Sequence, residues 1–176
     1  MNSKSGLTIV EILVTISVMA ILSSILVIYN RSSERQLILF KEQARLVSTL
    51  NRAKGMAMAL LREPPTAIVP CGYGVHLSTS TYLIFKNLPD ATENCGSDWN
   101  GSSEIYGETI KIDKNIEITA SSTLTTVFFI PPDLKTIVNN DINEISAETI
   151  IKIKGSSGNS NRKVIKVNKA GQITAE

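Results

Sequence analysis

The chain has few of the residues that build metal or catalytic centres. Its 176 residues include one histidine, two cysteines and one tryptophan, and aromatic residues make up 5%. This supply excludes the usual structural zinc sites, which need four cysteine or histidine ligands. The sequence contains no G-x-S-x-G, H-E-x-x-H, P-loop or G-x-G-x-x-G motif. We therefore expect no enzyme, no metal site and no cofactor.

A large excess of one charge is also absent, since 18 Lys and Arg residues oppose 16 Asp and Glu residues. That balance does not by itself indicate a nucleic-acid-binding protein. The length fits one domain with an appendage. The appendage is N-terminal, because residues 7–29 contain a single charge, Glu11, and neither glycine nor proline.

As a helix, residues 7–29 would extend about 34 Å, enough to cross the hydrocarbon core of a bilayer. Lys4 should keep the N-terminus in the cytoplasm and place Arg31 and the following residues outside. The alternative is a secretory signal peptide, which needs a small-residue cleavage site after its apolar run. Such a site is weakly marked, because the apolar run continues past Ser23 and Ser24.

Residues 5–14, Ser-Gly-Leu-Thr-Ile-Val-Glu-Ile-Leu-Val, closely resemble the N-terminal signal of type IV prepilins and type II secretion pseudopilins. In that family a prepilin peptidase removes a short basic leader that ends in glycine. The new N-terminal residue is then methylated, and a glutamate four residues further on serves filament assembly. The resemblance implies a leader of residues 1–6, cleavage between Gly6 and Leu7, methylation of Leu7 and an assembly role for Glu11. The chain departs from the commonest pattern at Leu7, where the family usually has phenylalanine.

Glu11 has a physical reason to matter in such a filament. An ionised carboxylate inside a membrane helix is costly. Cleavage after Gly6 creates a positive amine that the Glu11 carboxylate of a neighbouring subunit can neutralise, and both charges are expensive in a dry core if unpaired. The alternative is a carboxylate near the headgroups that is protonated or extends toward water.

Residues 30–63 have the pattern of an amphipathic helix, which Pro64 and Pro65 end. The predicted buried stripe consists of Phe40, Ala44, Val47, Leu50, Ala57 and Leu61. Together with residues 7–29, this segment would form one helix of 57 residues, roughly 85 Å long.

Residues 66–176 change to alternating segments rich in β-branched residues, which are typical of strands. The expected strands are residues 73–77, 81–85, 109–112, 116–119, 126–130, 149–154 and 163–167. Strands that follow one long helix predict an α+β fold, in which the C-terminal half of the helix packs on an antiparallel sheet. Parts of the chain are also similar to the H-type minor pseudopilins and their minor-pilin relatives: residues 46–57, 127–132 and 162–174.

Cys71 and Cys95 both lie in the expected extracytoplasmic domain, which suggests an oxidising compartment and one disulfide. The bridge would close a loop of about 25 residues, worth about 3 kcal/mol in the chain-entropy model. The alternative is two unpaired buried thiols. His76 lies in an alternating strand pattern, so we expect a surface or hydrogen-bonded strand histidine rather than a catalytic one.

Two charged clusters admit alternative interpretations. The acidic cluster consists of Asp90, Glu93, Asp98, Asn100 and Glu104. Its spacing matches no standard calcium loop, which favours a solvated turn. The basic cluster consists of Lys152, Lys154, Arg162, Lys163, Lys166 and Lys169. We interpret it as the exposed edge of a hairpin, where lysines deter strand pairing; the alternative is contact with DNA phosphates, as in minor pilins of DNA uptake.

These features favour a structural, filament-forming protein, a minor pilin or pseudopilin of a type IV pilus or a type II secretion-like machine. Its partners would be other pilin or pseudopilin subunits, prepilin peptidase, and the cytoplasmic membrane with its assembly platform. It would cross that membrane once, with an extracytoplasmic C-terminal domain, and join a surface filament after assembly. A DNA-binding minor pilin is the main alternative. A membrane-anchored enzyme or receptor is disfavoured, because no catalytic group is evident.

Overall fold

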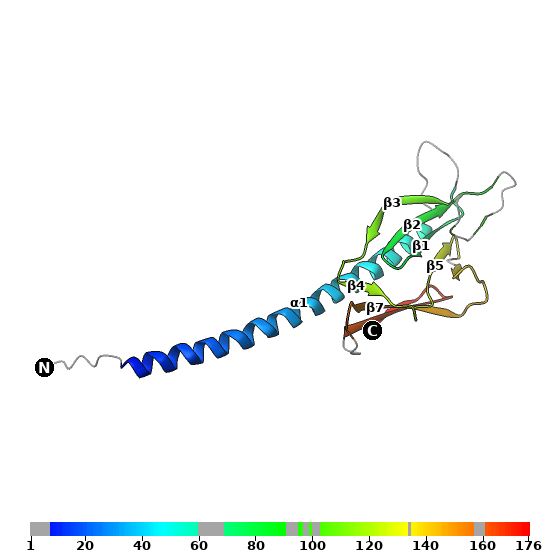
Figure 1. Cartoon of the computed structure of the whole chain (residues 1–176). Helices are drawn as coiled ribbons and strands as arrows, with labels where there is room; N and C mark the ends of the chain where they lie inside the picture. The colour runs from blue at the N-terminus through cyan, green and yellow to red at the C-terminus, as the bar shows by residue number, and fades with distance from the viewer. Residues whose placement is uncertain are drawn as a thin grey trace. The chain divides into compact units, whose positions relative to one another are not determined.

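The computed structural model describes residues 8–59, 69–90, 95–96, 99, 103–133, 135–156 and 161–176, with the backbone alone for residues 27–32. The chain divides into two compact units, Met1–Leu37 and Ile38–Glu176. One helix, α1 (Ile9–Ala59), belongs to both units, and the described strands all belong to the second (Figure 1). This arrangement confirms the predicted α+β fold, while the expected helix ends at residues 7 and 60–63 lie outside the described residues.

The second unit, which we call the head, buries one stripe of α1. The side chains of this stripe are at most 1% exposed: Leu39, Leu46, Leu50, Ala53 and Ala57. The predicted stripe was correct for Leu50 and Ala57 and wrong for Phe40, which is 51% exposed, and for Ala44. Consecutive helical residues point about 100° apart. The helix is therefore rotated by about one residue from the prediction, which brings Leu39 and Leu46 into the core.

The first sheet of the head has five antiparallel strands in the order β3-β2-β1-β5-β6. Their bounds are β1 Gly72–Leu77, β2 Thr81–Asn87, β3 Glu104–Lys111, β5 Thr126–Ile130 and β6 Lys135–Val138. The second sheet has the order β4-β7-β8-β9 and is also antiparallel, with β4 Ile116–Ile118, β7 Ser146–Ile153, β8 Arg162–Asn168 and β9 Ile173–Ala175. Each predicted strand has a counterpart, whereas β6 and β9 were not predicted. We expected one antiparallel sheet, and the described strands form two.

One hydrophobic core joins the buried stripe of α1 to both sheets. From the first sheet it takes alternate residues such as Tyr73 and Val75, because successive side chains of a strand point to opposite faces. The other face of this sheet carries a separate cluster, Leu83, Phe85, Phe128 and Ile137, against which Trp99 packs. Both faces of the first sheet therefore carry buried apolar side chains.

Candidate functional site

The first unit presents an apolar helix surface without a covering layer of its own. Residues Ile9–Leu26 form an 18-residue stretch that is long and apolar enough to cross a membrane, and none of it is buried. Large side chains such as Ile9, Val10 and Leu26 are more than 70% exposed. Since water contact with so much apolar surface is unfavourable, this stretch needs a lipid or protein environment. A signal sequence near an N-terminus would have the same length and composition.

Three hydroxyl groups within this stretch find partners inside the helix. The hydroxyls of Thr15, Ser17 and Ser24 donate to the carbonyl oxygens of Ile12, Leu13 and Ile21, at 2.8, 2.8 and 2.7 Å. In a bilayer, polar groups that lack such partners cost several kcal/mol each. These three hydroxyls are therefore satisfied within the helix itself.

Glu11 lies in the first turn of α1, and Thr8 caps this turn. The Glu11 backbone N–H lies 3.3 Å from Thr8 Oγ1 and 3.1 Å from the Thr8 carbonyl oxygen, and the Ile12 N–H also donates to Thr8 O. Thr8 and Glu11 have the spacing of a capping box, which satisfies the free N–H groups of a helix start. Among the residues that the structure describes, no cation lies within ion-pair distance of the Glu11 carboxylate. Gly6 and Leu7 lie outside the described residues.

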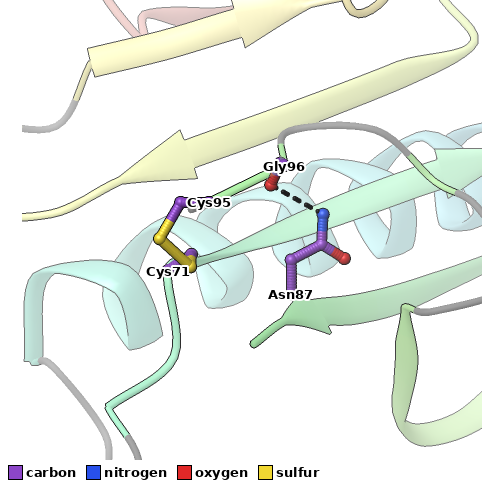
Figure 2. The surroundings of a disulfide bond; sticks show 4 residues. All are labelled: Cys71, Asn87, Cys95 and Gly96. Carbon is purple, nitrogen blue, oxygen red and sulfur yellow. Dashed lines mark hydrogen bonds between the residues drawn. A yellow bond between two sulfur atoms is a disulfide. The ribbon is translucent and has the colours of Figure 1, made fainter. Parts of the chain in front are cut away.

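The head carries the predicted disulfide between Cys71 and Cys95, whose Cα atoms are 5.5 Å apart (Figure 2). Two hydrogen bonds tie the same region to the end of β2. The Cys71 N–H donates to the Asn87 carbonyl oxygen at 2.8 Å, and Asn87 Nδ2 donates to the Gly96 carbonyl oxygen at 2.9 Å. The bridge therefore fastens the segment after β2 to the start of β1, and the alternative of two free thiols is wrong.

His76 is a hydrogen-bonded strand histidine, as expected. Its Nδ1 lies 3.2 Å from Thr126 Oγ1 on the neighbouring β5. Its ring stacks on Trp99 with centroids 5.4 Å apart, and burial lowers the pKa of His76 below its usual value. Neither contact supplies the carboxylate that orients the histidine of a catalytic triad.

A hollow of about 500 Å³ opens beside His76, at the ends of β1 and β4. It is lined by His76, Leu77, Ser78, Thr79, Ile118, Thr119, Ala120, Ser122, Leu124 and Thr125. Apart from His76, no titratable side chain belongs to this lining. The hollow therefore contains no acid–base pair.

The acidic cluster is only partly described, since Glu93, Asp98 and Asn100 lie outside the described residues. Glu104 begins β3 and pairs with Lys86 on β2, with Oε2 and Nζ 3.2 Å apart. Within the described ranges, no group of three or more histidine, cysteine, aspartate or glutamate side chains could hold a metal ion.

The basic cluster lies in and next to β7 and β8 of the second sheet, and its residues have different surroundings. Its interpretation as a sheet edge is wrong. β7 and β8 are both inner strands, because β4 and β9 flank them. Lys163 lies with its Nζ 4.6 Å from the centre of the Phe40 ring on α1, whereas Lys152 pairs with Glu117 at 3.2 Å. Lys166 stands opposite Glu148 in the β7–β8 register. The remaining basic residues are Lys154, Arg162 and Lys169, which are exposed.

The sequence interpretation missed Glu42, which is not part of the predicted buried stripe of α1. Glu42 is 6% exposed and lies in the helix turn between the buried Leu39 and Leu46. Its position three residues after Leu39 and four before Leu46 puts it on the buried side, which the sequence shows only once these two leucines are known to be in the core.

Comparison with known proteins gives one family match. Residues 1–27 match the prokaryotic N-terminal methylation motif. No curated protein and no solved structure matches the chain. The motif supports the resemblance to type IV pilins and pseudopilins, and it indicates a substrate of prepilin peptidase with a structural rather than a catalytic role. The similarity to H-type minor pseudopilins stays a prediction.

Proposed function

We propose that this protein is a minor pilin or pseudopilin, a subunit of a type IV pilus or of a type II secretion-like filament. The observation that carries the proposal is the coincidence of two features in one segment. The methylation motif covers residues 1–27, and the same segment contains the unburied apolar stretch Ile9–Leu26 with Glu11 in its first turn.

Processing would act on the leader. Prepilin peptidase would cut between Gly6 and Leu7, and methylation of the new amine at Leu7 would follow. The Thr8 cap supports this arrangement, because α1 begins at Ile9 and the proposed cut lies before the helix. The mature N-terminus would then be a cation two residues ahead of an apolar helix.

Glu11 would select the register between subunits. Its carboxylate lacks a cationic partner among the described residues, so the amine of a neighbouring subunit is a suitable counter-charge. Leaving either charge unpaired in a dry core costs several kcal/mol, and pairing them in good geometry offsets this penalty in part. A neighbour displaced along the axis would leave both groups unpaired.

Before assembly, the stretch Ile9–Leu26 would anchor the chain in the cytoplasmic membrane with the head on the extracytoplasmic side. The Cys71–Cys95 disulfide supports this side, because disulfides persist in oxidising compartments. In the filament the apolar side chains would pack on the helices of other subunits. The work of the protein would thus be assembly, with other pilins and the assembly platform as partners.

Leader removal tests the proposal directly. The full chain is produced in bacterial cells with an active prepilin peptidase, and its intact mass and N-terminal peptide are measured after extraction. We expect a chain that begins with N-methylated Leu7, and an unprocessed leader for the Gly6→Val variant. A wild-type chain that still begins at Met1, in cells that process a reference prepilin, would overturn the proposal.

A further inference from the structure

A buried carboxylate lies where α1 meets the first sheet of the head. Glu42 is 6% exposed, and its Oε2 has no hydrogen-bond partner among the described residues. The hydroxyl of Tyr82 on β2 is also buried nearby, and Thr49 of α1 is its neighbouring hydrogen-bonding side chain. Buried polar groups in native proteins are nearly always satisfied, so the unsatisfied carboxylate oxygen of Glu42 requires an explanation.

The charged and titratable groups that face Glu42 come from three elements. On α1 itself, Lys41 and Arg45 attract the carboxylate, and Arg45 Nη1 lies 3.7 Å from Glu42 Oε1. The connection between β3 and β4, residues 112–115, contributes Asp113, whose carboxylate repels Glu42 and whose backbone N–H lies within hydrogen-bond reach of it. Tyr82 on β2 is the third neighbour.

These partners compensate an ionised Glu42 poorly. Strong charge-assisted contacts are about 2.7–2.9 Å long, and the Arg45 contact is 3.7 Å long with an Arg45 side chain that is 48% exposed. Arg45 Nη1 also lies 3.5 Å from the carbonyl oxygen of Lys111 at the end of β3. The guanidinium therefore links the helix to the chain just before the connection.

We propose that Glu42 makes the docking of the β3–β4 connection on α1 depend on pH, with the connection held more firmly when Glu42 is protonated. A neutral carboxyl group can stay buried at little cost. An ionised carboxylate regains water when residues 112–115 move away from the helix, so ionisation favours opening.

The direction of the effect follows from burial, which raises the pKa of Glu42 above its usual 4.5 despite Arg45. The folded head then binds this proton at a pH where the unfolded chain has released it. Stability from this group is present at pH values near and below 4.5, and it is lost as the pH rises through the folded pKa. An extracytoplasmic head would be more firmly closed in acidic surroundings than in neutral ones.

Amide hydrogen exchange of the full chain in detergent micelles tests the proposal. Two hydrogen-bonded amides at the two ends of the connection serve as reporters, because Ile112 N–H donates to the Ser80 carbonyl oxygen and Ile116 N–H donates to the Asp113 carbonyl oxygen. Glu42→Gln imitates the neutral state, and Glu108→Gln on the exposed face of β3 is the matched control. Comparing proteins at the same pH cancels the chemical dependence of exchange on pH.

At pH 7.5 we expect both amides to exchange several-fold faster in the wild type than in Glu42→Gln, and the two proteins to converge at pH 4, where Glu42 is protonated because its pKa lies above 4.5. Glu108→Gln should follow the wild type at both pH values. Equal ratios at both pH values, or slower exchange in the wild type at pH 7.5, would overturn the proposal.

A measurement on the wild type alone guards against a variant that does not fold. The Glu42 carboxyl carbon is titrated by NMR in the full chain with labelled glutamate. We expect a midpoint above 4.5 and the same midpoint in the amide shifts of residues 112–116. A midpoint at or below the usual value, or amides that do not follow it, would contradict the inference.

Discussion

The ring of Phe85 occupies the space that a side chain on Gly74 would need. A Cβ atom on Gly74 would lie 2.5 Å from Phe85 Cζ and 2.7 Å from the carbonyl oxygen of Val127. Phe85 in turn stacks on Phe128, with ring centroids 5.6 Å apart. The glycine in β1 therefore lets three strands of the first sheet share one aromatic cluster.

Gly74→Ala should destabilise the head by about 1–3 kcal/mol, because overpacking forces rings and backbone to move. Gly55→Ala is the control, since a Cβ at that helix position meets nothing within 4 Å. This second change should stabilise the helix by about 0.5–1 kcal/mol. Chemical denaturation of the full chain, followed by circular dichroism, measures both. A Gly74→Ala protein as stable as the wild type would show that the cluster tolerates a methyl group.

Glu11→Ala should reduce incorporation into filaments by about tenfold or more, which corresponds to losing about 1.4 kcal/mol of subunit pairing. Membrane insertion should be unaffected or improved, because the anchor becomes more apolar. Glu34→Ala, which removes an exposed carboxylate from the same helix outside the apolar stretch, is the control. Sheared filaments and membrane fractions are compared by immunoblotting. Equal amounts of Glu11→Ala and wild type in filaments would leave Glu11 without an assembly role.

Cys95→Ser should lower the stability of the head by about 3 kcal/mol, the chain-entropy value for two cysteines 24 residues apart. Calorimetry of the full chain in detergent measures the loss, with the wild type before and after reduction as reference. Leader cleavage should continue, since the cut lies far from the bridge in sequence. Unchanged melting temperatures in the variant and the reduced wild type would show that the bridge adds little stability.

His76 should make the head less stable in acid. Burial lowers the pKa of His76 below its usual 6.5, so the unfolded chain takes up this proton at a higher pH than the fold does. Its contribution is therefore full above pH 6.5 and is lost as the pH falls through the folded pKa. Denaturation midpoints at pH 7.5 and pH 5 are compared for the wild type and His76→Gln, and Glu42 acts equally in both proteins. A wild type that loses no more stability than the variant would contradict this.

The composition and the spacing of apolar residues were enough to predict the helix and most strands. Residues 7–29 have one charge and no helix-breaking residue, which leaves few alternatives to an apolar helix. The strand β6 was missed because it has only four residues and follows Pro131 and Pro132. Such a short segment has too few alternating positions to reveal its period.

The missed strand β9 explains the error in the basic cluster. Without Ile173–Ala175 beside it, β8 is the last strand of the sheet, and its lysines look like edge protection. Three residues near the end of a chain carry almost no strand signal of their own. Their pairing with Ile165, Lys166 and Val167 is decided by tertiary structure.

The disulfide was predictable and Glu42 was not. Two cysteines in one domain leave a single intramolecular pairing. Glu42 with Arg45 three residues later has the pattern of an exposed helix ion pair. Because Phe40 and Ala44 offered a second apolar stripe, the sequence could not decide which side of the helix is buried.

Trp99 is the chain's one tryptophan; its ring stacks on His76 and is inclined to the ring of Phe85, with the Trp99 and Phe85 centroids 5.3 Å apart. Its fluorescence therefore comes from a single place, beside the disulfide-closed segment and against the outer face of the first sheet. A protonated imidazole stacked on an indole quenches its emission. The unlabelled protein thus contains its own optical reporter, which can follow the head in membranes and in filaments without an attached dye.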